Sequence, residues 1–131
     1  MFERDYILRI LQNFFEDVAR LIHGRRRYDD EQQLEAFGDL YKKYLKEERN
    51  YYYASSAENI LASFNDDPDG VYKAEMLANL LYHDACLQND ETIRKELLEK
   101  SLTLYRQVDV QSKDFSLERS EMIGIIGEML R

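Results

Sequence analysis

Residues 71–108 read VYKAEMLANLLYHDACLQNDETIRKELLEKSLTLYRQV, and this stretch decides the fold class. Its apolar residues recur every three or four positions, which is the spacing of one face of a helix. Asn89 and Asp90 interrupt the pattern and read as a turn and a helix cap. The stretch therefore predicts two helices joined by a short turn. The positions on one face are Ala74, Leu77, Ala78, Leu81 and Ala85 in the first helix, and Ile93, Leu97, Ser101, Leu104 and Val108 in the second.

The same helical spacing extends to the rest of the chain. It predicts helices over about residues 2–23 and 30–48, a short helix after Tyr51–Tyr53, and a last helix beginning near Phe115 or Ser116. Ser55 and Glu58 are spaced as a capping box for the short helix. With 131 residues, one proline and five glycines, the sequence predicts a single all-α domain over 1–131. We expect about six antiparallel helices, because short connections favour antiparallel neighbours.

The charge argues against two classes of partner. The net charge is −8, so the chain repels phosphate backbones, and Arg25–Arg27 is the only dense basic patch. We therefore expect no nucleic acid. The first predicted helix has no excess of Lys or Arg, and no apolar stretch is long enough to span a bilayer, so we expect no membrane partner. A lone Cys86 and the absence of a secretory signal favour a cytoplasmic protein.

Two patterns could bind a metal ion. Residues 65–70 read NDDPDG and resemble the start of an EF-hand loop, but the twelfth position, which should be a bidentate Glu, is Met76. This segment predicts a turn between helices, with Asp67 or Asp69 capping the next helix. His83 and Cys86 share a helix face, yet no further ligand is spaced to complete a zinc site or a catalytic site. We expect no metal, no cofactor and no enzymatic activity.

Two resemblances extend this interpretation. Residues 76–82 (MLANLLY) and 99–104 (EKSLTL) resemble the two helices of a tetratricopeptide repeat. Residues 4–9 (RDYILR), 56–61 (SAENIL) and 77–81 (LANLL), in that order, resemble a family of small bacterial all-helical proteins that are described only as tetratricopeptide-like. The second resemblance implies a bacterial cytosolic protein and brings no catalytic residues.

The tetratricopeptide resemblance implies a candidate interaction face. The first helix of such a pair lines the concave side of the fold, and polar and aromatic side chains on it are suited to peptide capture. The alternative interpretation is that this helix face is an ordinary surface in contact with solvent. The candidate residues are Glu75, Asn79, Tyr82, His83 and Cys86.

The sequence also leaves self-association open. The first and last predicted helices have broad apolar faces, which either pack on each other or form a homodimer. Tyr51–Tyr53 either covers the core or forms a recognition surface. We expect a non-catalytic protein-interaction or scaffold module that binds a protein, a peptide or a second copy of itself. The alternatives are a small-ligand or metal-binding sensor and an enzyme with an unrecognised site.

Overall fold

The computed structural model describes residues 2–24 and 28–131, and these residues form an all-helical fold. The all-α prediction is therefore confirmed. Arg25–Arg27, the predicted basic patch, lies outside the described residues. The helices are α1 (Phe2–His23), α2 (Asp30–Tyr44), α3 (Arg49–Ala54), α4 (Ala57–Phe64), α5 (Gly70–Leu87), α6 (Glu91–Gln111) and α7 (Leu117–Met129).

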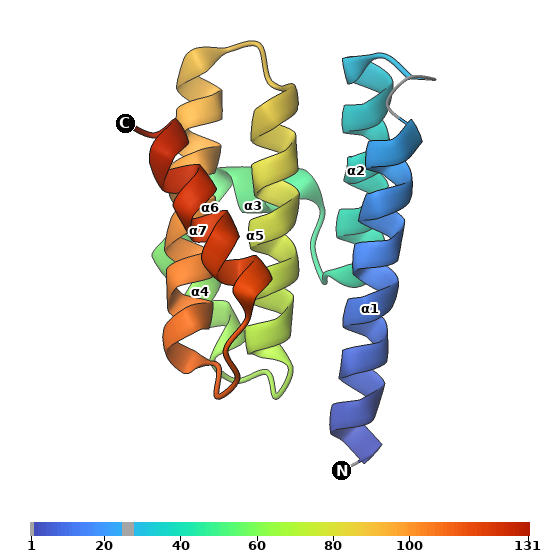
Figure 1. Ribbon diagram of the computed structural model, residues 1–131, viewed down its shortest axis with the longest axis vertical. Helices are drawn as coiled ribbons and strands as arrows, with labels where there is room; N and C mark the ends of the chain where they lie inside the picture. Colours follow the sequence, from blue (N-terminus) through green and yellow to red (C-terminus); the bar gives the residue numbers. More distant parts are fainter. Residues whose placement is uncertain (1, 25–27) are drawn as a thin grey trace.

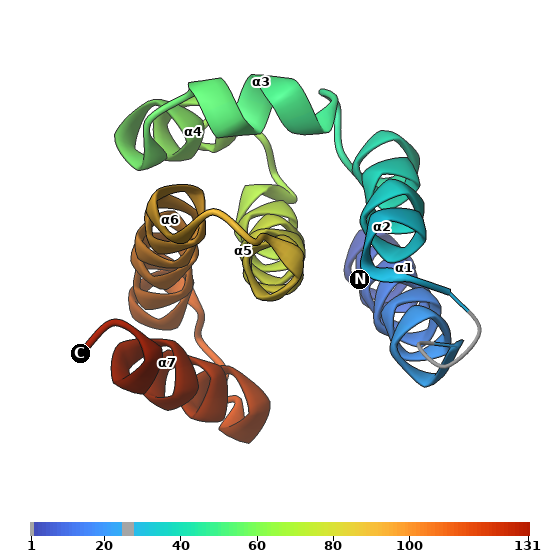
Figure 2. The ribbon, with the colours of Figure 1, turned by 90° about the horizontal axis from the view of Figure 1, so that it is seen from above.

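Helix α5 lies at the centre of the arrangement (Figure 1). It runs beside α6, to which the turn at Asn89–Asp90 connects it, and α2 packs on its other side. Viewed from above, α3 and α4 cover one side of this layer, while α1 and α7 stand to the two sides of α5 on the opposite side (Figure 2). Helix α1 packs on α2 and α5, and α7 packs on α6. The two terminal helices thus form two separate walls beside α5.

The composition of α5 explains its central position. A helix that is apolar around most of its circumference is stable only when other elements cover it on several sides. Leu77, Ala78, Leu80 and Leu81 are completely buried, and they point in different directions around the helix. On α6, the hydroxyl of buried Ser101 donates to the carbonyl of Ala78 at 2.6 Å, which joins the two central helices.

The region of the three tyrosines differs from the sequence-based expectation. Six helices were expected and seven are present in the described residues, the additional one being α3. Tyr52 on α3 is buried and covers the core, whereas Tyr51 is exposed. The cap of α4 is also one residue later than expected. Ser56 accepts from Asn59 N, while Ser55 closes α3 through its N–H to Tyr51 O.

The turn before α5 is held by its own side chains. Asp67 accepts a hydrogen bond from Asp69 N at 2.8 Å and pairs with Lys73, so it organises the start of the helix. Asp69 is the residue before α5, and its side chain makes no capping bond. Gly70 lies against the end of α4, where a Cβ would come within 2.2 Å of Phe64 O. This close approach requires glycine.

Candidate functional site

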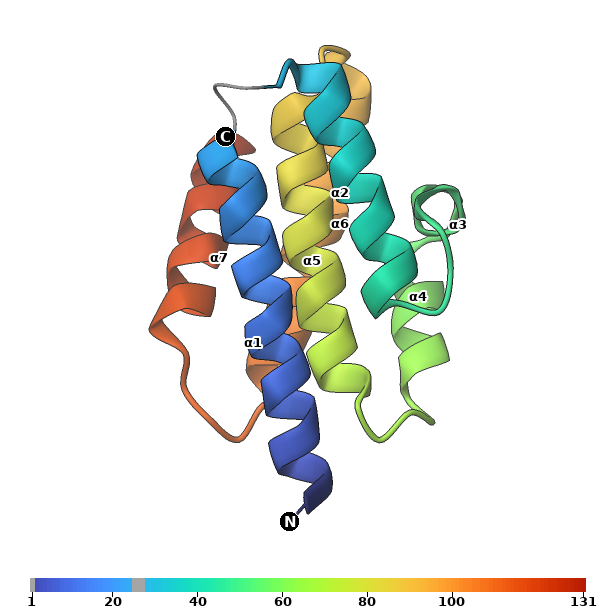
Figure 3. The same ribbon diagram turned by 90° about the vertical axis from the view of Figure 1, so that its right-hand side faces the viewer.

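Two adjoining cavities lie along α5, the first between α1 and α7 and the second between α2 and the end of α1. The first has a volume of about 300 Å³ and the second about 240 Å³, and both are lined by Ile22 and His83. Figure 3 shows α1 in front of α5, with α7 to one side of it and α2 to the other. We call the two cavities together the α5 groove.

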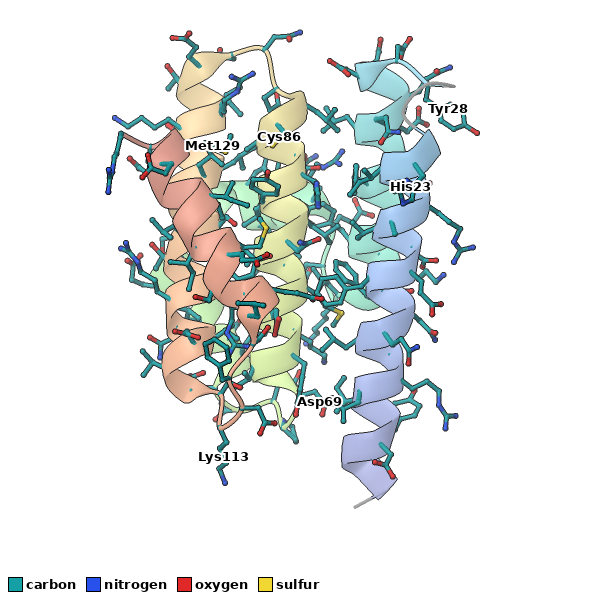
Figure 4. The ribbon with its side chains drawn as sticks, in the orientation of Figure 1. His23, Tyr28, Asp69, Cys86, Lys113 and Met129 are labelled. Carbon is teal, nitrogen blue, oxygen red and sulfur yellow. The ribbon has the colours of Figure 1, made fainter. Side chains whose placement is uncertain are left out.

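The groove contains all five residues that the sequence analysis placed on the candidate interaction face. Glu75, Asn79 and His83 line the first cavity, and Tyr82, His83 and Cys86 line the second. Figure 4 marks the length of α5, with Asp69 at one end and Cys86 near the other. A spacing of three or four residues keeps these side chains on one side of the helix.

The walls of the first cavity are mainly apolar. Helix α1 contributes Phe15, Val18, Ala19 and Ile22, and α7 contributes Met122 and Ile125. Three carboxylates, those of Glu75, Glu118 and Glu121, line it together with Arg119. A mostly apolar pocket with a few converging polar groups is the usual form of a binding site. Sequence reasoning missed the contribution of α7, because no periodicity shows which face of α5 a distant helix will border.

Arg119 fixes the α7 wall. Its side chain is 4% exposed, and its Nε donates to Asp109 Oδ1 at 3.0 Å. Its Nη2 donates to Asp114 O at 2.8 Å, and its Nη1 lies 3.6 Å from Glu75 Oε1. Burial raises the pKa of Glu75 above its ordinary value, and Arg119 opposes that effect. The guanidinium therefore bonds mainly to α6 and to the connection between α6 and α7. Its contact with Glu75 is a longer ion pair without a hydrogen bond.

Asn79, one of the residues that line the first cavity, has a side-chain atom without a hydrogen-bond partner in the described part of the chain. Its Nδ2 donates to the hydroxyl of Tyr105 at 3.1 Å, and both residues are buried. Its Oδ1 is buried and has no hydrogen-bond partner among the described residues. A buried carbonyl without a partner costs about 1–3 kcal/mol.

The second cavity is more aromatic. The His83 ring stacks on Phe37 of α2, with ring centroids 5.2 Å apart and planes 9° from parallel. Gln33 of α2 donates to Leu21 O at 2.6 Å, which holds α2 against α1 at this end of the groove. Cys86 is partly exposed. His83 is therefore part of the packed wall between α2 and α5.

A buried polar cluster on the α2–α3 side of α5 was not foreseen from the sequence. Asp84 is completely buried and accepts hydrogen bonds from the hydroxyls of Tyr41 and Tyr53, at 2.7 and 2.8 Å. Arg49 donates to the same carboxylate from Nε and Nη2, at 2.9 and 3.0 Å. Burial raises the pKa of Asp84, whereas Arg49 and the two tyrosines oppose that effect. The four donors join α2, α3 and α5, so the cluster holds the fold behind the groove.

The described residues contain no group of three or more His, Cys, Asp or Glu side chains arranged to hold a metal ion. Within the same residues, no helix is long and apolar enough to cross a bilayer. Comparison of the chain with protein-family models, with curated proteins and with solved structures gives no match.

Proposed function

We propose that this protein is a non-catalytic interaction module whose α5 groove binds a segment of a partner protein. The observation that carries the proposal is the pair of adjoining cavities along α5, with apolar walls and polar groups at intervals between them. Extended or helical segments bind grooves of this kind by placing successive side chains in successive pockets.

The arrangement of α5 and α6 supports the tetratricopeptide-like part of this proposal. The two helices pack side by side and are joined by a short turn (Figure 2). Residues of α5 line both cavities of the groove. We extend the proposal to membership of the small bacterial all-helical family, on the sequence resemblance alone, and to a cytoplasmic location, on that resemblance and on the lone Cys86.

The polar groups of the groove favour binding over catalysis. His83 is stacked on an aromatic ring, and Glu75 is paired with Arg119 across 3.6 Å. Asp84 is completely buried and its carboxylate is engaged by four donors, so it is held away from the groove. These groups shape and charge a surface, which is what a docking site requires.

A peptide-display selection tests the proposal. A random peptide library is selected on the wild-type protein, and the enriched peptides are synthesised and measured by fluorescence polarisation. Ala19 is exposed and lines the first cavity, so Ala19→Trp should block the groove. Ala62 is exposed on α4, outside the groove lining, so Ala62→Trp is a matched control. Peptides that bind the wild type and A62W but not A19W support the proposal, and peptides that bind all three proteins equally contradict it.

Self-association is a second candidate function, favoured by exposed apolar side chains on α7 and just before it. Phe115 and Leu117 are 79% and 62% exposed, and Ile125 and Met129 are also exposed. Figure 4 places Met129 near the end of α7. Native mass spectrometry distinguishes the two candidates. A dimer that Leu117→Glu converts to a monomer supports self-association, and a wild-type monomer rejects it.

A further inference from the structure

We propose that the first cavity of the α5 groove receives a lysine side chain of the bound segment, with its ammonium group between the Glu75 carboxylate and the Asn79 carbonyl oxygen. This inference rests on the proposed function, because the lysine belongs to the partner that the groove binds.

The Oδ1 atom of Asn79 lacks a hydrogen-bond donor within the described residues, and a ligand could supply one. Its Nδ2 is already used on Tyr105, which leaves Oδ1 buried and without a partner in the described part of the chain. Asn79 is 6% exposed and lines the cavity. An ammonium group has three donors and no acceptor, so it can bond Oδ1 and a carboxylate at the same time.

The charge of the cavity has the sign that a cation requires. Glu75, Glu118 and Glu121 contribute three carboxylates to the lining, and Arg119 contributes one guanidinium. The carboxylate nearest to that guanidinium is that of Asp109, at 3.0 Å, and not that of Glu75, at 3.6 Å. The cavity therefore retains an excess of negative charge, which attracts a basic side chain and repels an acidic one.

The spacing of the two acceptors fits an ammonium. Glu75 and Asn79 are four residues apart on α5, so their Cβ atoms are about 5–6 Å apart on the same face. A compact ammonium between them can reach both at ordinary hydrogen-bond distances of about 2.8–3.0 Å. A planar guanidinium carries five donors in a fixed fork, which suits a single carboxylate bound through both oxygens better than two separate acceptors on one helix face.

The size and walls of the cavity fit the rest of the lysine side chain. Its four methylene groups can lie along apolar surface while the charged end meets polar groups. Phe15 and Val18 of α1 and Met122 of α7 provide that surface. An uncharged aliphatic side chain would fill the same space, but it would leave Asn79 Oδ1 unpaired and Glu75 further desolvated.

The peptides from the display selection test the inference directly. We expect them to share a lysine at one position. Replacing that lysine with norleucine, which keeps the aliphatic chain and removes the charge, should weaken binding to the wild-type protein roughly ten-fold or more. Replacing it with arginine should also weaken binding. Because this change is made in the peptide, the fold of the protein is not affected.

The protein variant Glu75→Gln identifies the acceptor. In this variant the difference between the lysine and norleucine peptides should shrink several-fold, since the carboxylate that distinguishes them is gone. Glu96 is exposed on α6 and does not line the groove, so Glu96→Gln removes one charge elsewhere and should leave the difference unchanged. Circular dichroism checks that both variants are folded.

Three outcomes separate the two proposals. A shared lysine whose effect depends on Glu75 supports both of them. Peptides that are blocked by A19W but carry no shared lysine, or that bind equally well with norleucine, leave the docking groove in place and overturn the lysine site. A selection that yields no peptide sensitive to A19W overturns both.

Discussion

Replacing Asp84 with asparagine should strongly destabilise the fold. The substitution keeps the shape of the side chain, but it removes the charge that faces Arg49 and puts an amide donor among existing donors. Asp84 is completely buried, and the Arg49 side chain is only 19% exposed. The variant therefore leaves a cation without its counter-charge in a largely dry site.

The magnitude follows from this geometry. Each hydrogen bond to a charged group contributes about 1.5–3 kcal/mol, and Asp84 accepts four of them. The full sum overestimates the loss, because the asparagine side chain retains one acceptor and Arg49 can regain some water. We expect about 3–5 kcal/mol, the usual cost of removing one partner of a buried ion pair. For 131 residues this lowers the melting temperature by about 11–18 °C.

Urea denaturation followed by circular dichroism, together with calorimetry, measures the effect. Asp39 is exposed on α2, so Asp39→Asn is a matched control and should stay within about 0.5 kcal/mol of the wild type. If the Asp84 variant does not fold, Tyr53→Phe removes a single donor to the carboxylate and should cost about 1.5–3 kcal/mol. A loss below about 1 kcal/mol for D84N, or equal stability of Y53F and D39N, would refute the reasoning.

Three smaller predictions concern two glycines, one at the start of α5 and one on α7, and an ion pair at the start of α5. Gly70→Ala should destabilise the protein by about 1–3 kcal/mol, because its Cβ would meet Phe64 O. Gly124→Ala should instead stabilise it by about 0.5–1 kcal/mol, because a Cβ there meets nothing within 4 Å and alanine favours the helix; thermal melts that rank the two alike would contradict both. The hydrogen bond from Lys73 lowers the pKa of Asp67 below 3.8, so this pair stabilises the fold above that pH and loses its effect as the pH falls through the lower value. Lys73→Met should therefore reduce stability at pH 7 and approach the wild type in acid, and a gap that does not narrow as the pH falls below 3.8 would count against this ion pair.

The candidate site shows how far a sequence pattern reaches. Glu75, Asn79 and His83 could be placed on one face of a helix, because a period of 3.6 residues fixes which side chains share a side. The same period does not show which other helices lie across from that face of α5. The cavity depends on α1 and on Arg119 of α7, which are distant in the chain and are brought there by packing.

The buried cluster around Asp84 shows the limit more sharply. Asp84 lies 43 residues from Tyr41 and 35 from Arg49, and these separations follow no local repeat. The sequence offered one signal of this cluster, namely an acidic residue, Asp84, among the apolar residues of α5. A buried carboxylate is stable only when hydrogen-bond donors or cations surround it. The identity of those partners depends on how α2 and α3 fold back.

The sequence by itself determined the all-helical class, most of the helices and the composition of the face that α5 presents, because these depend on local spacing and on the burial of apolar surface. Only the tertiary structure decided that α5 lies at the centre and that α1 and α7 stand apart as two walls. It also decided that Asn79 keeps a buried oxygen without a partner among the described residues and that Arg49 reaches Asp84. These features depend on the relative placement of whole helices, and many long-range contacts fix that placement together.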